Sequence, residues 1–158
     1  MLINQEFISS NKWYRLQYPR TWECEIVENI PSFFDPLFGK GALQILSINM
    51  NYLENTKDVV GQYPFMAGNN IDDKMKIFLH THSISFEKNP PRHFINKDMI
   101  VLPYEFMQGG HFFMVVMFQR DNIFLLCLYN SPGLPEDEES KTIASIIQSI
   151  EITGEQLI

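Results

Sequence analysis

Cysteine is scarce in this chain: only Cys24 and Cys127, two of the 158 residues, carry a thiol. Both lie in strand-like runs of apolar residues, and the sequence gives no sign of the oxidising compartment that a disulfide needs. We therefore expect no disulfide framework, but two reduced thiols that pack as small, mostly buried core residues.

Long apolar segments are absent as well. The longest apolar runs, residues 112–118 and 123–129, are too short to span a bilayer and are separated by four polar residues. The first residues contain neither a basic segment nor a long apolar stretch, so we expect no signal peptide unless one has been removed. These absences predict a cytoplasmic protein without membrane contact.

Basic residues are in the minority: 12 Lys and Arg stand against 19 Asp and Glu, for a formal net charge of -7. Six of the acids but only one of the bases follow residue 133, so the body is nearly neutral and one end is acidic. Without a basic stripe to neutralise phosphates, the chain is not expected to bind nucleic acid. The acids at residues 136–139 suit the first turn of a helix, whose dipole they complement; the alternative is a docking site for a basic partner.

Signatures of catalysis and of metal binding are missing too. There is no Gly-x-Ser-x-Gly elbow, neither cysteine has a local histidine signature, and residues 39–41 lack the spacing of a phosphate-binding loop. His80 and His82 are the first candidates for metal ligands. In a helix that runs through His82, however, the two rings point about 200° apart and cannot share an ion. We expect no cofactor and no metal, and we favour a protein without enzymatic activity.

What the chain does contain predicts a single domain over residues 1–158. Its 45% hydrophobic content is ordinary for a soluble globular protein, and the 13 Phe residues suggest a core filled by large rings. Alternating apolar residues over 14–18 and over 22–26 predict two strands that form a hairpin around a turn led by Pro19. Residues 42–50 predict a further strand.

Residues 112–118 and 123–129 predict the two central strands. Both runs are apolar on both faces, which indicates a sheet covered on both sides. Their short polar connection, residues 119–122, is typical of an antiparallel hairpin. Residues 99–107 predict another strand, in which Pro103 indicates an edge or a bulge.

Two helices are expected to cover this sheet. Asn69 or Asn70 caps the first helix, and the last one begins near Pro135 and carries an isoleucine stripe over residues 143–150. The apolar face of the first helix consists of Ile71, Met75, Phe78 and Leu79. The sequence does not decide which face of the sheet this first helix covers. Residues 51–60 are ambiguous and predict at most one or two helical turns.

Several motifs lie at the two ends of the chain: Tyr14-x-Leu16-x-Tyr18-Pro19-x-x-Trp22, Phe34-Asp35-Pro36, the strand-like residues 42–45 and the closing isoleucine stripe. Together they resemble the PsbP-like fold, which includes the extrinsic P subunit of the photosynthetic oxygen-evolving complex, a Ran-binding nuclear import regulator and bacterial families of unknown function.

The resemblance is closest to those bacterial families. It implies an α+β fold, in which an antiparallel β-sheet flanked by helices forms an α/β/α sandwich, and a binding or assembly role rather than catalysis. It covers the ends of the chain and the order of the elements. Because the middle of the chain matches no family motif, no functional residue carries over.

Aromatic residues in turn-rich segments form the candidate partner-binding site. Phe33, Phe34 and Phe38 lie in an apolar loop predicted for residues 30–41. Tyr63 and Phe65 lie in a second segment of this kind. Apolar side chains exposed on loops tend to mark interaction sites. The alternative is that these rings fold back as a lid on one end of the core.

These features favour a bacterial, non-catalytic binding or assembly module with a protein partner. An immunity-type protein that neutralises a toxin is an alternative. One alternative is self-association through an edge strand. Another is a small-molecule-binding protein or enzyme with a pocket at one end of the sheet, lined by His82, His111 or Cys127. A deep pocket with converging polar groups would favour this last class, and a flat aromatic patch would favour a binding module.

Overall fold

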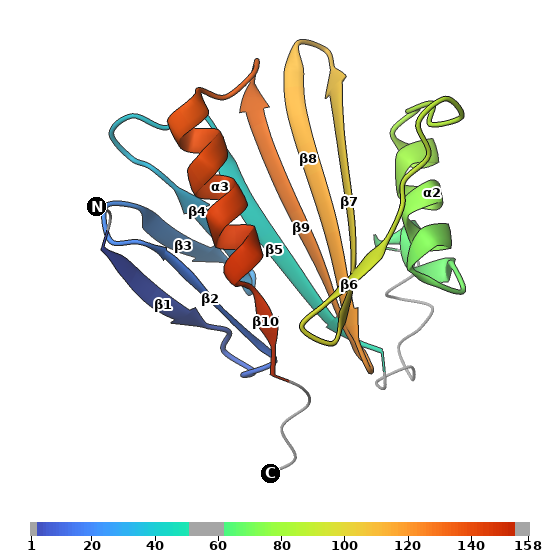
Figure 1. Cartoon of the computed structure of the whole chain (residues 1–158), viewed down its shortest axis with the longest axis horizontal. Coiled ribbons are helices and arrows are strands. Elements are labelled where there is room, and N and C mark those ends of the chain that lie inside the picture. Colours follow the sequence, from blue (N-terminus) through green and yellow to red (C-terminus); the bar gives the residue numbers. More distant parts are fainter. Residues whose placement is uncertain (1–2, 51–61, 154–158) are drawn as a thin grey trace.

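The described part of the chain folds into two antiparallel sheets and two α-helices (Figure 1). The computed structural model describes residues 3–50 and 62–153, so the helical turns expected at 51–60 lie outside the described residues. In chain order the elements are β1 (Asn4–Ile8), β2 (Tyr14–Pro19), β3 (Glu23–Val27), β4 (Ile30–Phe34), β5 (Ala42–Asn49), the 3-10 helix η2 (Pro64–Ala67), α2 (Ile71–Thr81), β6 (Phe94–Asn96), β7 (Met99–Gln108), β8 (His111–Arg120), β9 (Ile123–Pro132), α3 (Asp137–Ser149) and β10 (Glu151–Ile152).

The main sheet has the strand order β3-β4-β5-β9-β8-β7-β6, with β8 and β9 near its middle. These two strands are adjacent and antiparallel, which confirms the predicted central hairpin. Its turn is shorter than expected and consists of Asp121 and Asn122, because the two residues before them still pair with β9. Asp121 has a φ of 52°, a positive value typical of tight hairpin turns.

The predicted hairpin at residues 14–18 and 22–26 is wrong, although both of its strands exist. Strand β2 pairs with β1 and β10 in a separate small sheet, whereas β3 pairs with β4 in the main sheet. The turn after Pro19, whose carbonyl accepts a hydrogen bond from the Trp22 N–H at 3.0 Å, carries the chain from one sheet to the other. Tyr14 and Leu16 of β2 therefore join Trp22 and Cys24 in a core cluster instead of sharing a hydrogen-bond ladder with them. Ile26, on the same face of β3 as Cys24, is 57% exposed.

Residues 30–34 form strand β4 where a loop was expected. A two-residue turn at Glu28 and Asn29, with φ values of 52° and 68°, folds β4 back onto β3. Both residues adopt a left-handed backbone conformation, as a type I′ hairpin turn requires, and asparagine tolerates this conformation. The Pro and Phe residues that indicated an apolar loop belong instead to this strand.

The outer edge of the sheet agrees with the position of Pro103. Strand β6 pairs only with residues Met99 to Val101 of β7. Among the described residues, β7 therefore has no outer neighbour at Pro103, whose side chain is exposed. The predicted edge position is confirmed, because a residue without an N–H is tolerated where no ladder partner needs one.

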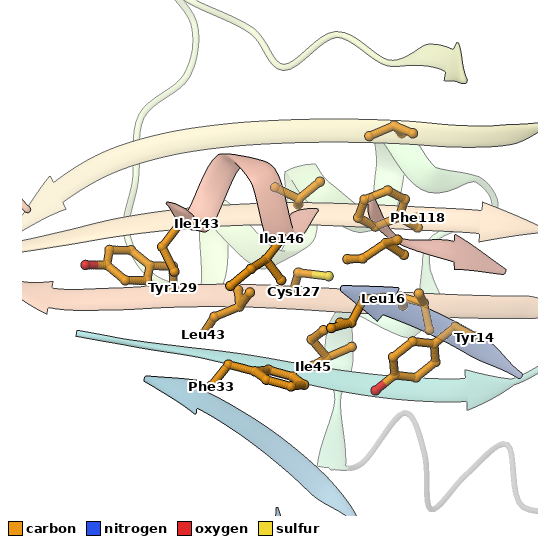
Figure 2. Close-up of a cluster of buried hydrophobic side chains, with 14 of the residues drawn as sticks. Tyr14, Leu16, Phe33, Leu43, Ile45, Phe118, Cys127, Tyr129, Ile143 and Ile146 are labelled. Carbon is orange, nitrogen blue, oxygen red and sulfur yellow. The ribbon is translucent and has the colours of Figure 1, made fainter. Parts of the chain in front are cut away.

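Both faces of the central strands are covered, as their two-sided apolarity predicts. Along β9, Ile123, Leu125, Cys127 and Tyr129 belong to one core cluster, while Phe124 and Leu126 belong to another. The small sheet and α3 cover the first cluster, and α2 covers the second. Figure 2 shows the first cluster, where Leu16 of β2 and Ile146 of α3 meet the side chains of β5 and β9. The structure thus places the two helices on opposite faces.

The helix boundaries follow the caps in the sequence closely. The Asn70 side chain accepts a hydrogen bond from the Asp73 N–H at 2.9 Å and caps α2 as predicted. Helix α3 begins after Glu136, so Pro135 lies just outside the first turn in which we expected it. Within the isoleucine stripe, Ile143, Ile146 and Ile150 are buried, and Ile147 lies at the margin of the contact.

Candidate protein-interaction surface

Two of the five candidate partner-binding rings lie in the core. Phe33 is 0% exposed and contacts the rings of Phe7 and Tyr18. Phe65 is 5% exposed and lies beneath α2, against Phe78. Burial explains both, because each side chain fills the space between a sheet and the element that covers it. Neither ring is available to a partner in this structure.

The other three candidates reach the surface to different degrees. Phe34 points to the opposite side of β4 from Phe33; it is half-buried and lines an open hollow together with His111. Tyr63 is also half-buried and lines a separate hollow. Phe38 is 85% exposed. The structure therefore does not bring the candidate rings together into one patch.

Phe38 lies instead on a loop that presents a second large apolar side chain. Residues 35–41 connect β4 to β5, and Leu37 beside Phe38 is 79% exposed. The Asp35 carboxylate holds this turn by accepting hydrogen bonds from the Leu37 and Phe38 N–H groups, at 3.1 and 3.2 Å. A Cβ atom on Gly39 would lie 2.6 Å from the Asp35 carbonyl oxygen, so the turn requires glycine there. The exposed side chains thus stand on a defined backbone.

Glu139, in the first turn of α3, fastens this loop to the body of the protein. Its carboxylate accepts hydrogen bonds from the Lys40 and Gly41 N–H groups, at 2.9 and 3.2 Å, and from the Tyr129 hydroxyl of β9. Burial raises the pKa of Tyr129, and the neighbouring carboxylate raises it further, against a smaller opposing effect of the Ser131 side chain. Tyr129 therefore stays a neutral hydrogen-bond donor, and one carboxylate links loop, helix and sheet.

A hollow of about 340 Å³ lies between this loop and the first turn of α3. We call it the acidic hollow. It is lined by the apolar side chains of Trp22, Leu37 and Phe38, by the carboxylates of Asp35, Glu136, Glu138 and Glu139, by Lys40, and by Thr21 and Thr142. Figure 1 places the loop, the connection from β9 to α3 and the start of α3 at the same end of the molecule. Leu134, on that connection, is 67% exposed.

Sequence reasoning found only part of this surface. It selected Phe38, and it named the acids at residues 136–139 as an alternative docking site for a basic partner, but it did not select Leu37 or Tyr129. The Asp-Pro pair followed by two closely spaced glycines was the available local indication of a fixed turn. Glu139 lies 99 residues from Lys40 in the sequence, so no local pattern connects them.

The side chains expected to line the pocket of a small-molecule-binding protein or enzyme do not converge. Cys127 is 0% exposed in the core, where burial raises the pKa of its thiol. His111 is exposed at the start of β8, and His82 follows the last residue of α2 with its ring centroid 4.5 Å from that of Phe78. Within residues 3–50 and 62–153, no three His, Cys, Asp or Glu side chains gather as metal ligands would.

Both cysteines are free thiols, with Cys127 buried and Cys24 half-buried. Burial raises the pKa of the Cys24 thiol as well, so both groups are kept protonated and weakly nucleophilic. Among the described helices, none has the length and apolarity to cross a membrane.

No protein-family model and no curated protein sequence matches the chain. Several solved structures, by contrast, match the chain. The cyanobacterial PsbP protein (CyanoP) of Synechocystis superimposes with a TM-score of 0.54 at 12% identity, over 96% of this chain and 94% of that one. The fold is PsbP-like. The resemblance inferred from the two ends of the sequence is thereby confirmed at the level of the fold.

Two further structures share the PsbP-like fold with this chain. The Saccharomyces cerevisiae Ran-binding protein Mog1p has a TM-score of 0.58 at 6% identity, over 98% of this chain and 97% of that one. A Bacteroides thetaiotaomicron protein has a TM-score of 0.55 at 19% identity, over 96% of this chain. The match covers 49% of the Bacteroides protein, so this chain spans about half of its length.

Proposed function

We propose that this protein is a non-catalytic binding module, which docks a protein partner on the surface formed by the 35–41 loop, Leu134 and the first turn of α3. The observation that carries the proposal is the 79% and 85% exposure of Leu37 and Phe38 on a backbone fixed by two carboxylates. Isolated exposed apolar residues are common on proteins. Two adjacent ones on a fastened loop, with a third at the same end of the molecule, form an interaction surface.

The energetics of such a surface favour binding. Full burial of one large apolar side chain contributes about 1.5–3 kcal/mol, so covering three gains several kcal/mol before the cost of association. A fixed loop keeps that cost low, because little backbone entropy is lost on binding. The hydrogen bonds that the Asp35 and Glu139 carboxylates accept from the loop N–H groups supply this preorganisation before any partner arrives.

The structural neighbours are compatible with this role. Mog1p, which has the same fold, is a Ran-binding protein. We propose a bacterial, cytoplasmic setting, with which two free thiols agree. An immunity-type protein differs from this proposal only in that its partner is a toxin.

Site-specific photo-crosslinking in the native host tests the proposal. We would replace Phe38 with p-benzoylphenylalanine and, as a control, make the same replacement at Ile95, which is 75% exposed on β6. We expect a discrete adduct from position 38 and none from position 95. Excess purified parent protein should compete with the adduct, and the Phe38→Ser variant should not. No adduct at position 38, or the same adduct at both positions, would overturn the proposal.

A further inference from the structure

We infer that the acidic hollow receives an arginine side chain of the partner, flanked by apolar residues that cover Leu37 and Phe38. This inference rests on the proposed function and names the chemistry of the partner. It depends on three properties of the acidic hollow: its charge, its free carboxylates and its apolar surface.

The acidic hollow carries an excess of negative charge. Four carboxylates and a single ammonium, that of Lys40, line it. The N-terminus of α3 adds a partial positive charge equivalent to roughly half an elementary charge. That partial charge is much smaller than the excess negative charge of the carboxylates, so the acidic hollow remains negative and attracts a cation.

Two of these carboxylates are available to a ligand. Asp35 and Glu139 are occupied by loop N–H groups. The side chain of Glu136 makes no capping hydrogen bond, although this residue is the N-cap of α3. Across the described ranges, neither Glu136 nor Glu138 has a side-chain hydrogen bond or ion pair. Both can therefore accept hydrogen bonds from an incoming cation without losing an existing contact.

The apolar part of the acidic hollow favours a guanidinium over an ammonium. Trp22, which is only 6% exposed, contributes a small part of the lining, and the far more exposed side chains of Leu37 and Phe38 extend the apolar surface. Guanidinium is planar, is weakly hydrated, packs on aromatic surfaces and donates hydrogen bonds in pairs to carboxylates. An ammonium is a compact, strongly hydrated charge that gains less from such a lining. A hollow of about 340 Å³ lies at the small end of ligand sites, which suits one long side chain with its neighbours.

Peptide titrations followed by amide NMR test the inference on the full chain. Three blocked peptides carry arginine, lysine or norleucine at the centre of an otherwise identical leucine- and glycine-containing sequence. We expect the arginine peptide to bind roughly tenfold more tightly than the norleucine peptide at low salt. Its contacts should shift the amide signals of Lys40 and Gly41. The lysine peptide should bind with intermediate affinity, and the preference should shrink in high salt.

Charge variants locate the effect. The double variant Glu136→Gln with Glu138→Gln should remove the preference for arginine, while leaving binding of the norleucine peptide unchanged. The control variant Glu87→Gln with Glu105→Gln removes the same charge from exposed positions outside the acidic hollow. It should retain the preference for the arginine peptide. Circular dichroism confirms that both variants fold.

The outcomes separate this inference from the proposed function. Equal affinity of the arginine and norleucine peptides overturns the inference, as does a preference that survives in the double variant. Equal affinity of the arginine and lysine peptides overturns the choice of arginine. Absence of binding by all three peptides at millimolar concentration also overturns it. The photo-crosslink at position 38 decides the proposed function independently, because it does not require a basic partner.

Discussion

Replacing Glu139 with glutamine tests the contact that fixes the interaction surface. The carboxylate accepts two backbone hydrogen bonds from the 35–41 loop and one from the Tyr129 hydroxyl. The single side-chain oxygen of glutamine can accept some of these hydrogen bonds. The glutamine NH2 group is itself a donor, however, and cannot accept a hydrogen bond from the donors that remain. Glu139→Gln should therefore release the loop without changing side-chain size.

The expected loss is about 2–4 kcal/mol in the free energy of unfolding. Hydrogen bonds to charged groups contribute roughly 1.5–3 kcal/mol each, and partial exposure together with non-additivity keeps the total well below the sum of three. For a chain of this length the loss corresponds to a decrease in Tm of roughly 5–15 °C. Urea unfolding followed by circular dichroism measures the free energy directly.

Glu138→Gln is the matched control, because Glu138 lies in the same first turn but has no side-chain partner among the described residues. It loses only the interaction with the helix dipole, about 0.3–1 kcal/mol. Tyr129→Phe removes one donor and should cost an intermediate amount. If Glu139→Gln and Glu138→Gln unfold within about 0.5 kcal/mol of each other, the proposed fastening of the loop is refuted.

Three further predictions concern the core, the titrating groups and the surface. Ile146→Asp buries an unpaired carboxylate under α3 and should cost several kcal/mol, enough to unfold a marginal domain; an unchanged urea midpoint would contradict the docking of this helix. Burial raises the pKa of Cys127 and Tyr129 above their usual 9.0 and 10.0. Above these values the folded protein retains protons that the unfolded chain releases, so the free energy of unfolding should be unaffected by these groups at lower pH and should fall as the pH rises. Tyr129→Phe should make that decline less steep, and an equal decline in both proteins would count against the assignment. Phe38→Ser should leave the urea midpoint unchanged, because the side chain is 85% exposed; a large loss would show that the ring packs on the core instead.

Local patterns in the sequence determined much of the scaffold. Two-sided apolarity identified β8 and β9 as covered central strands, the polar residues between them identified their hairpin, and Asn70 identified the start of α2. These features depend on residues that are neighbours in the chain. Periodicity, capping and turn chemistry therefore suffice to predict them.

Tertiary structure decided which strands pair and which rings reach the surface. Alternation in residues 14–18 and 22–26 predicted two strands, but the same apolar faces are satisfied by packing across a core or by pairing in a hairpin, and the structure has the former. For the same reason Phe33 and Phe38, both apolar and five residues apart, differ in exposure from 0% to 85%. The contact of Glu139 with the Lys40 and Gly41 N–H groups joins segments almost a hundred residues apart. Such a contact exists only after both sheets and α3 have packed, because local sequence fixes backbone conformation but not which distant surfaces meet.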